Sequence, residues 1–242
     1  MATYRSDFRS LFPTSMTVSE RKAKALKAAE KLGRKQKLDP VVIEKQLAVT
    51  WWGKAWNKNL ENYADYSNRI SRGRSYVRNG AVLDLKIEPG VVRALVQGSA
   101  KKPYEIEIKI VPLSNEKWES ILTLCNHKID NLAELVEGKF PKELEEIFTL
   151  KGKGLFPTTK EIKFGCSCYD GANMCKHVSA ALYGIGARFD QDPTLFFMLR
   201  NIDFEVLLKK TIEQKMQSLL ENSDKKSNRV LDDKDVFGLF GL

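Results

Sequence analysis

Four potential metal ligands, Cys166, Cys168, Cys175 and His177, lie within twelve residues of this chain. They form the pattern Cys-x-Cys, six intervening residues, then Cys-x-His. Three thiolates and one imidazole fill the tetrahedral shell of a structural zinc site without a water ligand. A filled shell leaves no open position for chemistry. The pattern therefore predicts a structural Zn²⁺ site and favours a folded recognition module over an enzyme.

The local sequence explains how the four side chains could meet. Residues 160–164 are typical of a strand, and side chains two apart on an extended chain point the same way, so the first two thiols can face one ion. Residues 169–174 contain an Asp-Gly pair, which favours a turn that brings Cys175 back. A helix is expected over residues 175–186, and its N-terminal dipole favours nearby thiolates. The alternative is that these are ordinary buried cysteines.

The same motif resembles the signature of the SWIM zinc finger, which is Cys-x-Cys, a variable gap, then Cys-x-His. The chain is similar to the bacterial SWIM zinc finger family proteins over most of residues 45–205. The segments that carry the similarity outside the motif are 50–59 (TWWGKAWNKN), 63–98, 154–163 (GLFPTTKEIK) and 182–190 (LYGIGARFD).

The resemblance implies that Cys166, Cys168, Cys175 and His177 are the zinc ligands. SWIM domains are associated with binding DNA or proteins. Members of the bacterial group are often encoded beside SNF2-type helicase-like ATPases, which makes such an ATPase an expected partner.

Charge gives an independent indication of the partner. The 242-residue chain has 40 Lys and Arg against 31 Asp and Glu, a net charge of +9, which suits a polyanion such as nucleic acid. Residues 1–38 hold 10 basic and 3 acidic residues, and residues 151–188 hold 6 and 2, whereas residues 103–150 hold 5 and 10. One interpretation is a joint basic face made by the N-terminal arm, the arginine-rich segment 69–80 and the zinc motif, with the acidic helices turned elsewhere. The alternative is a set of unrelated solvated faces.

The arginine-rich segment 69–80 (RISRGRSYVRNG) is the first candidate for nucleic-acid contact. We expect an extended strand, on which alternate side chains share one face and Gly73 permits close approach of a partner. Arginine binds phosphate in a bidentate manner. In the alternative, these arginines pair with the acidic helices. The predicted contacts are Arg69, Arg72, Arg74, Tyr76, Arg78 and Lys176, with DNA placed ahead of RNA.

Two further segments allow a binding or a structural interpretation. Trp51, Trp52 and Trp56 alternate with lysines and could stack on bases, but their helical spacing favours the core. A basic helix over residues 18–32, with Ser19 as a possible cap, could lie on phosphates or remain a solvated arm.

Hydrophobic periodicity predicts the fold class. Residues 82–87, 91–97 and 104–110 alternate as strands of an antiparallel meander with one buried side. Helices are expected over residues 114–125, 129–137, 142–148, 193–200 and 203–220, the last two covering the core. The predicted fold is α+β: an antiparallel β-meander with packed helices plus a small zinc-stabilised strand-turn-helix unit.

The predicted organisation has five parts. They are a basic N-terminal arm and helix (1–40), an α+β domain (41–150), the zinc finger (151–190), C-terminal helices (191–220), and a linker with an apolar tip (221–242). The tip could dock on a partner or pack on its own domain. Four cysteines without an apparent signal peptide or long apolar span predict a cytoplasmic protein without membrane contact.

Catalysis is not expected. Cys125 and His127 could act as nucleophile and base or as a spare metal pair, but residues two apart on a helix point about 200° apart. The sequence also has no Walker motif and no nucleophile elbow. We therefore expect a zinc-binding, non-catalytic nucleic-acid-binding accessory protein that acts with an SNF2-type ATPase. The alternatives are a protein-interaction adaptor without nucleic-acid binding and a hydrolase that uses Cys125.

Overall fold

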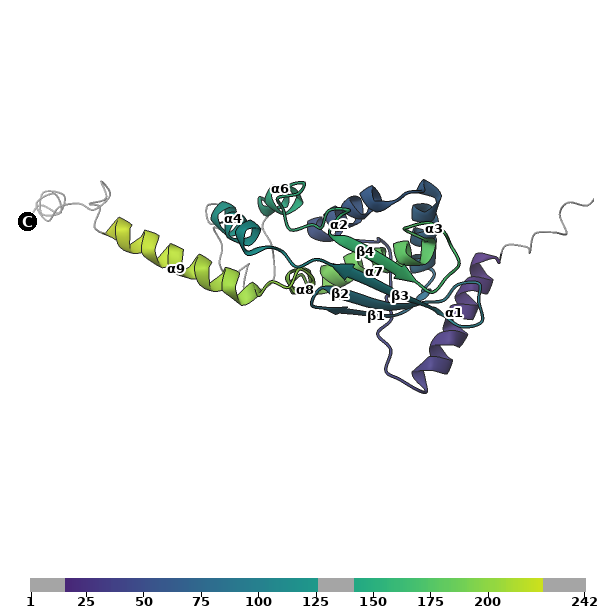
Figure 1. The fold of residues 1–242 in the computed structure, drawn as a ribbon. Coiled ribbons are helices and arrows are strands. Elements are labelled where there is room, and N and C mark those ends of the chain that lie inside the picture. Colours follow the sequence, from purple (N-terminus) through teal and green to yellow (C-terminus); the bar gives the residue numbers. More distant parts are fainter. Residues whose placement is uncertain (1–15, 126–141, 224–242) are drawn as a thin grey trace, which may run out of the picture.

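The computed structural model of the protein describes residues 16–125 and 142–223 (Figure 1). Its strands are β1 (Val82–Glu88), β2 (Val91–Val96), β3 (Tyr104–Ile110) and β4 (Ile162–Cys166). Its helices are α1 (Val18–Gly33), α2 (Trp51–Leu60), the 3-10 helix η2 (Glu61–Tyr63), α3 (Ser67–Arg78), α4 (Asn115–Cys125), α6 (Leu144–Thr149), α7 (Lys176–Gln191), α8 (Thr194–Leu199) and α9 (Phe204–Ser223).

The four strands form one antiparallel sheet in the order β1-β2-β3-β4, which confirms the predicted α+β class and meander. Gly90, at φ +71°, forms the tight turn between β1 and β2, a conformation that glycine adopts without strain. One row of paired residues crosses the sheet from Leu85 through Ala94 and Ile106 to Cys166. The first potential metal ligand therefore lies at the edge of the main sheet, in register with core residues.

Helix α7 covers one face of the sheet and contacts all four strands. Most of its residues are buried, because α2 and α3 also pack against it (Figure 1). Small residues make this close packing possible. A Cβ placed on Gly73 of α3 would lie 2.1 Å from Ser179 Oγ of α7. Helix α7, which begins at the cluster, is thus the central element of the core.

The other face of the sheet carries charged side chains. Lys86, Arg93 and Lys109 are exposed there, and Arg93 forms ion pairs with Glu88 and Glu107. Alternation of apolar and charged residues is expected for an antiparallel sheet with one solvated face. Within residues 16–125 and 142–223, no helix has the length and apolar character needed to cross a membrane.

The tryptophan-rich helix α2 belongs to the core, as its spacing predicted. Trp56 is completely buried, and its indole N–H donates a hydrogen bond of 2.8 Å to the Leu182 carbonyl of α7. Its ring also packs edge-on against Phe189, at a centroid distance of 5.2 Å. Trp56 is therefore not placed to stack on bases.

Three details differ from the sequence predictions. The cap of α1 is Thr17, in a capping box with Glu20, and not Ser19. The segment 69–80 is not an extended strand, because Ser67–Arg78 forms helix α3. The described side chains of helix α9 that pack on the core, Phe204 and Leu208, lie near its start, and Figure 1 shows the helix projecting away from the body. The helix predicted over residues 129–137 lies outside the described residues.

Candidate metal centre and the adjoining cleft

The four predicted ligands come together at the junction of β4 and α7. Cys166 ends β4, Cys175 caps the N-terminus of α7, and His177 lies in the first turn of that helix. Their ligand atoms and the Cys168 sulfur all lie within 4.8 Å of one another. The Nδ1 atom of His177 is 3.9 Å from the sulfurs of Cys166 and Cys175.

These distances can be compared with those of a bound ion. Zn–S bonds of about 2.3 Å and Zn–N bonds of about 2.0 Å give S–S edges of about 3.8 Å and S–N edges of about 3.5 Å in a tetrahedron. The four donors need only small shifts to reach that geometry. Three sulfurs and one imidazole nitrogen therefore form a cluster that could hold a metal ion.

The imidazole of His177 is held by aromatic contacts. It stacks on Tyr104 at a centroid distance of 4.2 Å and meets Tyr76 nearly edge-on at 5.4 Å. Its Nε2 atom is buried and has no hydrogen-bond partner among the described residues. A Cβ on Gly98 would lie 2.7 Å from this nitrogen. Packing against the two tyrosine rings, together with the missing side chain at Gly98, therefore orients Nδ1 toward the sulfurs. At many metal sites a hydrogen bond to the other ring nitrogen orients the histidine instead.

The loop between Cys168 and Cys175 is fixed from outside by Asp65. Its carboxylate accepts hydrogen bonds from the backbone N–H groups of Asn173, at 2.7 Å, and Met174, at 3.3 Å. Burial alone would raise the pKa of Asp65, but these hydrogen bonds outweigh it and hold the pKa below its usual value. Asp65 therefore stabilises the backbone immediately before Cys175.

Asp170 fixes the same loop from within. It accepts a hydrogen bond from the Ala172 N–H at 3.3 Å and pairs with Arg69 at 3.0 Å and Lys176 at 3.9 Å. Desolvation acts to raise the pKa of this carboxyl, but the hydrogen bonds and the two cations lower it overall. Asp170 thus joins the loop to α3 and to the start of α7.

The thiols influence one another. A hydrogen bond with the Cys166 thiol lowers the pKa of Cys175 to about 4, and His177 and the Val178 N–H contribute further. The same hydrogen bond raises the pKa of Cys166. Because the thiolate is the metal-binding form of cysteine, the hydrogen bonds to Cys175 favour the state that could bind a metal ion.

The predicted nucleic-acid contacts do not share one face. On a helix, Arg69, Arg72 and Tyr76 lie on one side, next to Lys176 of α7, whereas Arg74 and Arg78 lie on the other. Arg74 also donates a 2.7 Å hydrogen bond to the Tyr183 hydroxyl and pairs with Glu61. Arg78 is exposed near Lys54 and Lys58, at a different surface hollow. The expected row of Arg72, Arg74, Tyr76 and Arg78 was therefore wrong.

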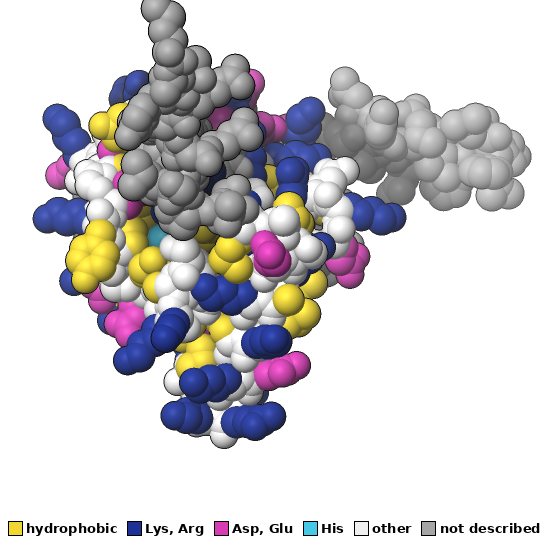
Figure 2. All heavy atoms as spheres, turned by 90° about the vertical axis from the view of Figure 1, so that its right-hand side faces the viewer, with side chains coloured by type: hydrophobic (Ala, Val, Ile, Leu, Met, Phe, Trp, Pro, Cys, Tyr) yellow, Lys and Arg dark blue, Asp and Glu magenta, His cyan; other side chains and the backbone are white. Residues whose placement is uncertain are grey.

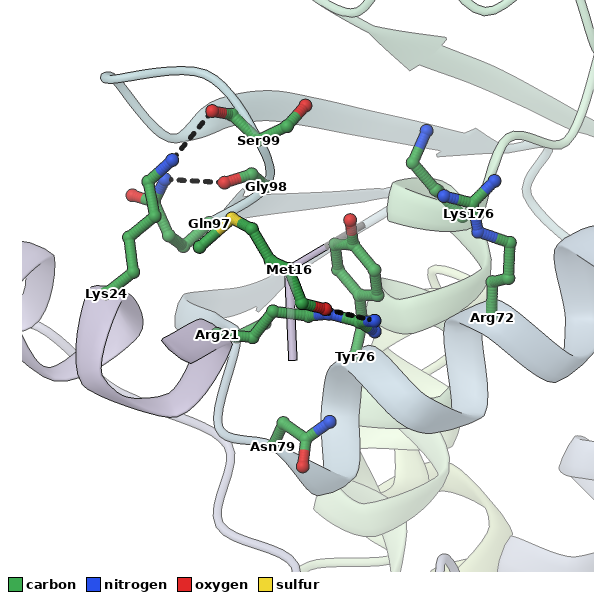
Figure 3. Close-up of a pocket in the computed structure, with 11 residues that line it drawn as sticks. Met16, Arg21, Lys24, Arg72, Tyr76, Asn79, Gln97, Gly98, Ser99 and Lys176 are labelled. Atoms are coloured by element: carbon green, nitrogen blue, oxygen red, sulfur yellow. Dashed lines mark hydrogen bonds between the residues drawn. The ribbon is translucent and has the colours of Figure 1, made fainter. Parts of the chain in front are cut away.

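A cleft of 470 Å³ opens beside the cluster, between α1, α3, the start of α7 and the segment after β2 (Figure 3). We call it the basic cleft, because four of its lining residues are Lys or Arg and none is acidic. Its lining residues are Met16, Arg21, Lys24, Arg72, Tyr76, Asn79, Ala81, Gln97, Gly98, Ser99 and Lys176. Figure 2 views the molecule from the α1 side, where Lys and Arg side chains outnumber acidic ones on the visible surface.

Sequence reasoning missed several of these residues. The role of Asp65 depends on contacts 108 residues away along the chain, and nothing in its local sequence indicates them. Arg21 and Lys24 were assigned to a basic arm, whereas the structure places them on one wall of the cleft. The sequence predicted a turn at Asp170, but it did not predict the ion pairs of Asp170 with Arg69 and Lys176.

The fold and the cluster define the class of this chain as an α+β protein with a Cys₃His potential metal centre. No family model matches the chain, and no solved structure matches it either. It is 37% identical over 163 residues to the "Uncharacterized protein Rv2102" of Mycobacterium tuberculosis (strain ATCC 25618 / H37Rv). The matched region covers 67% of this chain and 58% of that protein, so the chain spans less than two thirds of this relative's length.

Proposed function

We propose that the protein is a zinc-binding, non-catalytic accessory protein of the SWIM type that binds nucleic acid, with DNA ahead of RNA. The observation that carries this proposal is the position of the Cys₃His cluster, which joins the end of β4 to the start of α7 beside a cleft lined by cations. A bound Zn²⁺ would supply a structural cross-link there, held by Cys166, Cys168, Cys175 and His177.

The donor set supports zinc as the metal. Thiolates with one imidazole are typical structural zinc ligands, whereas Mg²⁺ and Ca²⁺ prefer oxygen donors. Cys175 and His177 are buried, with exposed fractions of 2% and 1%, which also suits a structural role for the metal. A complete shell offers no position for a substrate, which supports a non-catalytic function.

The geometry does not favour a hydrolase. Cys125 is completely buried in the core, where a substrate could not reach its sulfur. His127 lies outside the described residues. An accessible, activated thiol is what nucleophilic catalysis requires.

Mobility-shift titration at two salt concentrations tests nucleic-acid binding directly. We expect single- and double-stranded DNA to be retained at low salt and the affinity to fall as the salt concentration rises. On duplex DNA, the logarithm of the binding constant should fall with the logarithm of the salt concentration with a slope of about −0.9 per phosphate contact. RNA should bind more weakly. If none of these nucleic acids is retained at low salt, the proposal fails.

A protein-interaction adaptor is the second candidate function, and helix α9 favours it. Met216 and Leu220, one turn apart on this projecting helix, have exposed fractions of 60% and 65% (Figure 1). Apolar side chains so spaced can bind a groove on a partner. The family resemblance suggests an SNF2-type ATPase as that partner.

Co-elution with a purified SNF2-type ATPase tests this second function. The wild-type protein should form a complex, and Met216→Glu should weaken it, whereas Lys163→Gln on the outer sheet face should not. Equal complex formation by wild type and Met216→Glu would exclude α9 as the binding element.

A further inference from the structure

The basic cleft has an unusual charge distribution. Arg21 and Lys24 enter it from α1, Arg72 from α3 and Lys176 from α7 (Figure 3). No Asp or Glu of residues 16–125 and 142–223 belongs to its lining. Like charges gathered around one hollow repel one another unless an anion lies between them.

The four cations differ in how far the protein already satisfies them. Arg21 donates hydrogen bonds of 3.0 and 2.8 Å to the Met16 carbonyl, and Lys24 donates one of 2.6 Å to the Ser99 carbonyl. Among the described residues, Lys176 forms an ion pair with Asp170 alone, at 3.9 Å. Arg72 is exposed and has no hydrogen bond or ion pair with any described residue. Arg72 and Lys176 are therefore the cations best able to bind a ligand.

Tyr76 provides a second, independent observation. Its side chain is buried, with an exposed fraction of 7%, yet its hydroxyl has no hydrogen-bond partner within residues 16–125 and 142–223. Figure 3 shows this hydroxyl pointing into the cleft, between the α1 residues and the pair Arg72 and Lys176. The hydroxyl is accessible from the cleft, where it can donate a hydrogen bond to an oxygen of a ligand.

The chemistry of the lining identifies the ligand class. A guanidinium, an ammonium and a phenol hydroxyl around one point match the oxygens of a phosphate group. The volume of 470 Å³ exceeds what a phosphate ion fills, and Met16, Ala81 and the Tyr76 ring add apolar surface. Pockets of this size accept small organic ligands.

We propose that the basic cleft binds the phosphate of a nucleotide-sized unit, with Arg72, Lys176 and the Tyr76 hydroxyl as its contacts. This inference deepens the proposed function and rests on it in naming nucleic acid as one source of the phosphate. A free nucleotide is the other source. The shared chemistry is the phosphate group, and the probes of the experiment separate the two sources.

Tyr76 also connects the cleft to the metal centre. The Tyr76 hydroxyl faces the cleft. The ring that carries it packs against the His177 ring at a centroid distance of 5.4 Å. Removal of the metal should therefore loosen the wall that positions this hydroxyl. The binding experiment uses the zinc-loaded full chain for that reason.

Binding is measured by titration calorimetry with three probes: adenosine monophosphate, adenosine without phosphate, and a short single-stranded DNA oligonucleotide. We expect Arg72→Gln and Lys176→Gln to weaken binding of a phosphate-bearing probe by about 10-fold or more, as for hydrogen bonds to charged groups. Tyr76→Phe should weaken it by about 3-fold, because it removes only the hydroxyl and keeps the ring against His177. Adenosine should not bind.

Lys163→Gln is the matched control, because it removes one exposed positive charge on β4 outside the cleft lining. It should bind like wild type. Zinc content and circular dichroism check that each variant is folded, and Tyr76→Phe keeps the test decisive if a charge variant is unstable.

The outcomes separate this inference from the proposed function. If both phosphate-bearing probes bind all variants as they bind wild type, the cleft is not their site, and this inference fails while the proposed function stands. If adenosine monophosphate binds with the expected dependence on Arg72 and the oligonucleotide does not bind, the cleft assignment stands and nucleic-acid binding fails. If no phosphate-bearing probe binds, the cleft assignment is overturned.

Discussion

At the scale of single residues, Asp65 shows how a side chain outside the Cys₃His cluster can fix the backbone of that cluster. It lies outside the ligand segment, yet its two carboxylate oxygens accept hydrogen bonds from the backbone of the residues just before Cys175. Groups that hold the surroundings of ligands in place commonly change metal affinity when they are removed.

Asp65→Asn should therefore lower the affinity for zinc by about 10-fold, because the amide offers one acceptor oxygen in place of two. Competition with a zinc chelator of known affinity measures the change. Asp192→Asn is a matched control, since Asp192 also accepts a backbone N–H, that of Thr194, at a distant helix start. Equal affinities for both variants and wild type would remove Asp65 from this role.

Glu161 gives a prediction for pH. Desolvation acts to raise its pKa, but hydrogen bonds from Thr158 and from the buried Arg200 lower it to about 2. A carboxyl whose pKa is lower in the folded state stabilises the fold above its unfolded pKa, near 4.5. That stabilisation is lost as the pH falls from about 5 toward about 2.

Glu161→Gln should therefore reduce stability at pH 7 and flatten the loss of stability below pH 5. Urea unfolding at a series of pH values measures both effects. Parallel pH profiles for wild type and Glu161→Gln would show that Glu161 does not contribute in this way.

At the scale of elements, the contact between α3 and α7 depends on Gly73. An added methyl group would lie 2.1 Å from Ser179 Oγ and 2.5 Å from Ser179 Cβ. Either the helices must separate or Ser179 must move. Because α7 also carries Cys175 and His177, separation would disturb the cluster.

Gly73→Ala should destabilise the protein by about 1 to 3 kcal/mol, the usual effect of overpacking a core. Thermal or urea unfolding measures it. Ser179→Gly in the same chain should restore part of the loss, since it removes the side chain that the methyl group meets. Unchanged stability in Gly73→Ala would mean that the two helices are less closely packed than described.

The elements also show what the sequence could and could not predict. Strands β1 to β3 were predicted within two residues, because alternation with period two reflects a sheet with one buried face. In α3, the residues Arg72, Arg74, Tyr76 and Arg78 are also two apart, and this spacing led to the wrong prediction of a strand. The buried residues Ile70, Gly73 and Val77 follow the helical period and were the correct signal.

The Cys₃His cluster was predictable because its four residues are close in sequence and their spacing is set by a strand, a turn and a helix start. A joint basic face of the N-terminal arm, the arginine-rich segment and the zinc motif was one interpretation of the charge pattern, but the cleft itself was not predicted. Its cations come from α1, α3 and α7, and only the packing of these helices brings them to one point. The direction of α9 was not predicted, for the same reason. The spacing of its apolar residues predicts a helix but does not indicate which elements the helix contacts.

At the scale of the whole molecule, the Cys₃His cluster occupies a central position. It lies where the last strand of the sheet meets the helix that contacts all four strands. The cluster residues Cys175 and His177 are part of the buried core and are not confined to a peripheral finger. We therefore expect metal binding to be coupled to the stability of the entire fold.

Metal content combined with unfolding tests this central expectation most directly. Elemental analysis of the purified protein should give one zinc ion per chain, and a strong chelator should remove it together with cooperative unfolding. Cys166→Ser should contain less than one zinc and melt at a lower temperature. A wild-type protein that carries no zinc and keeps the same melting temperature with and without chelator would contradict the account.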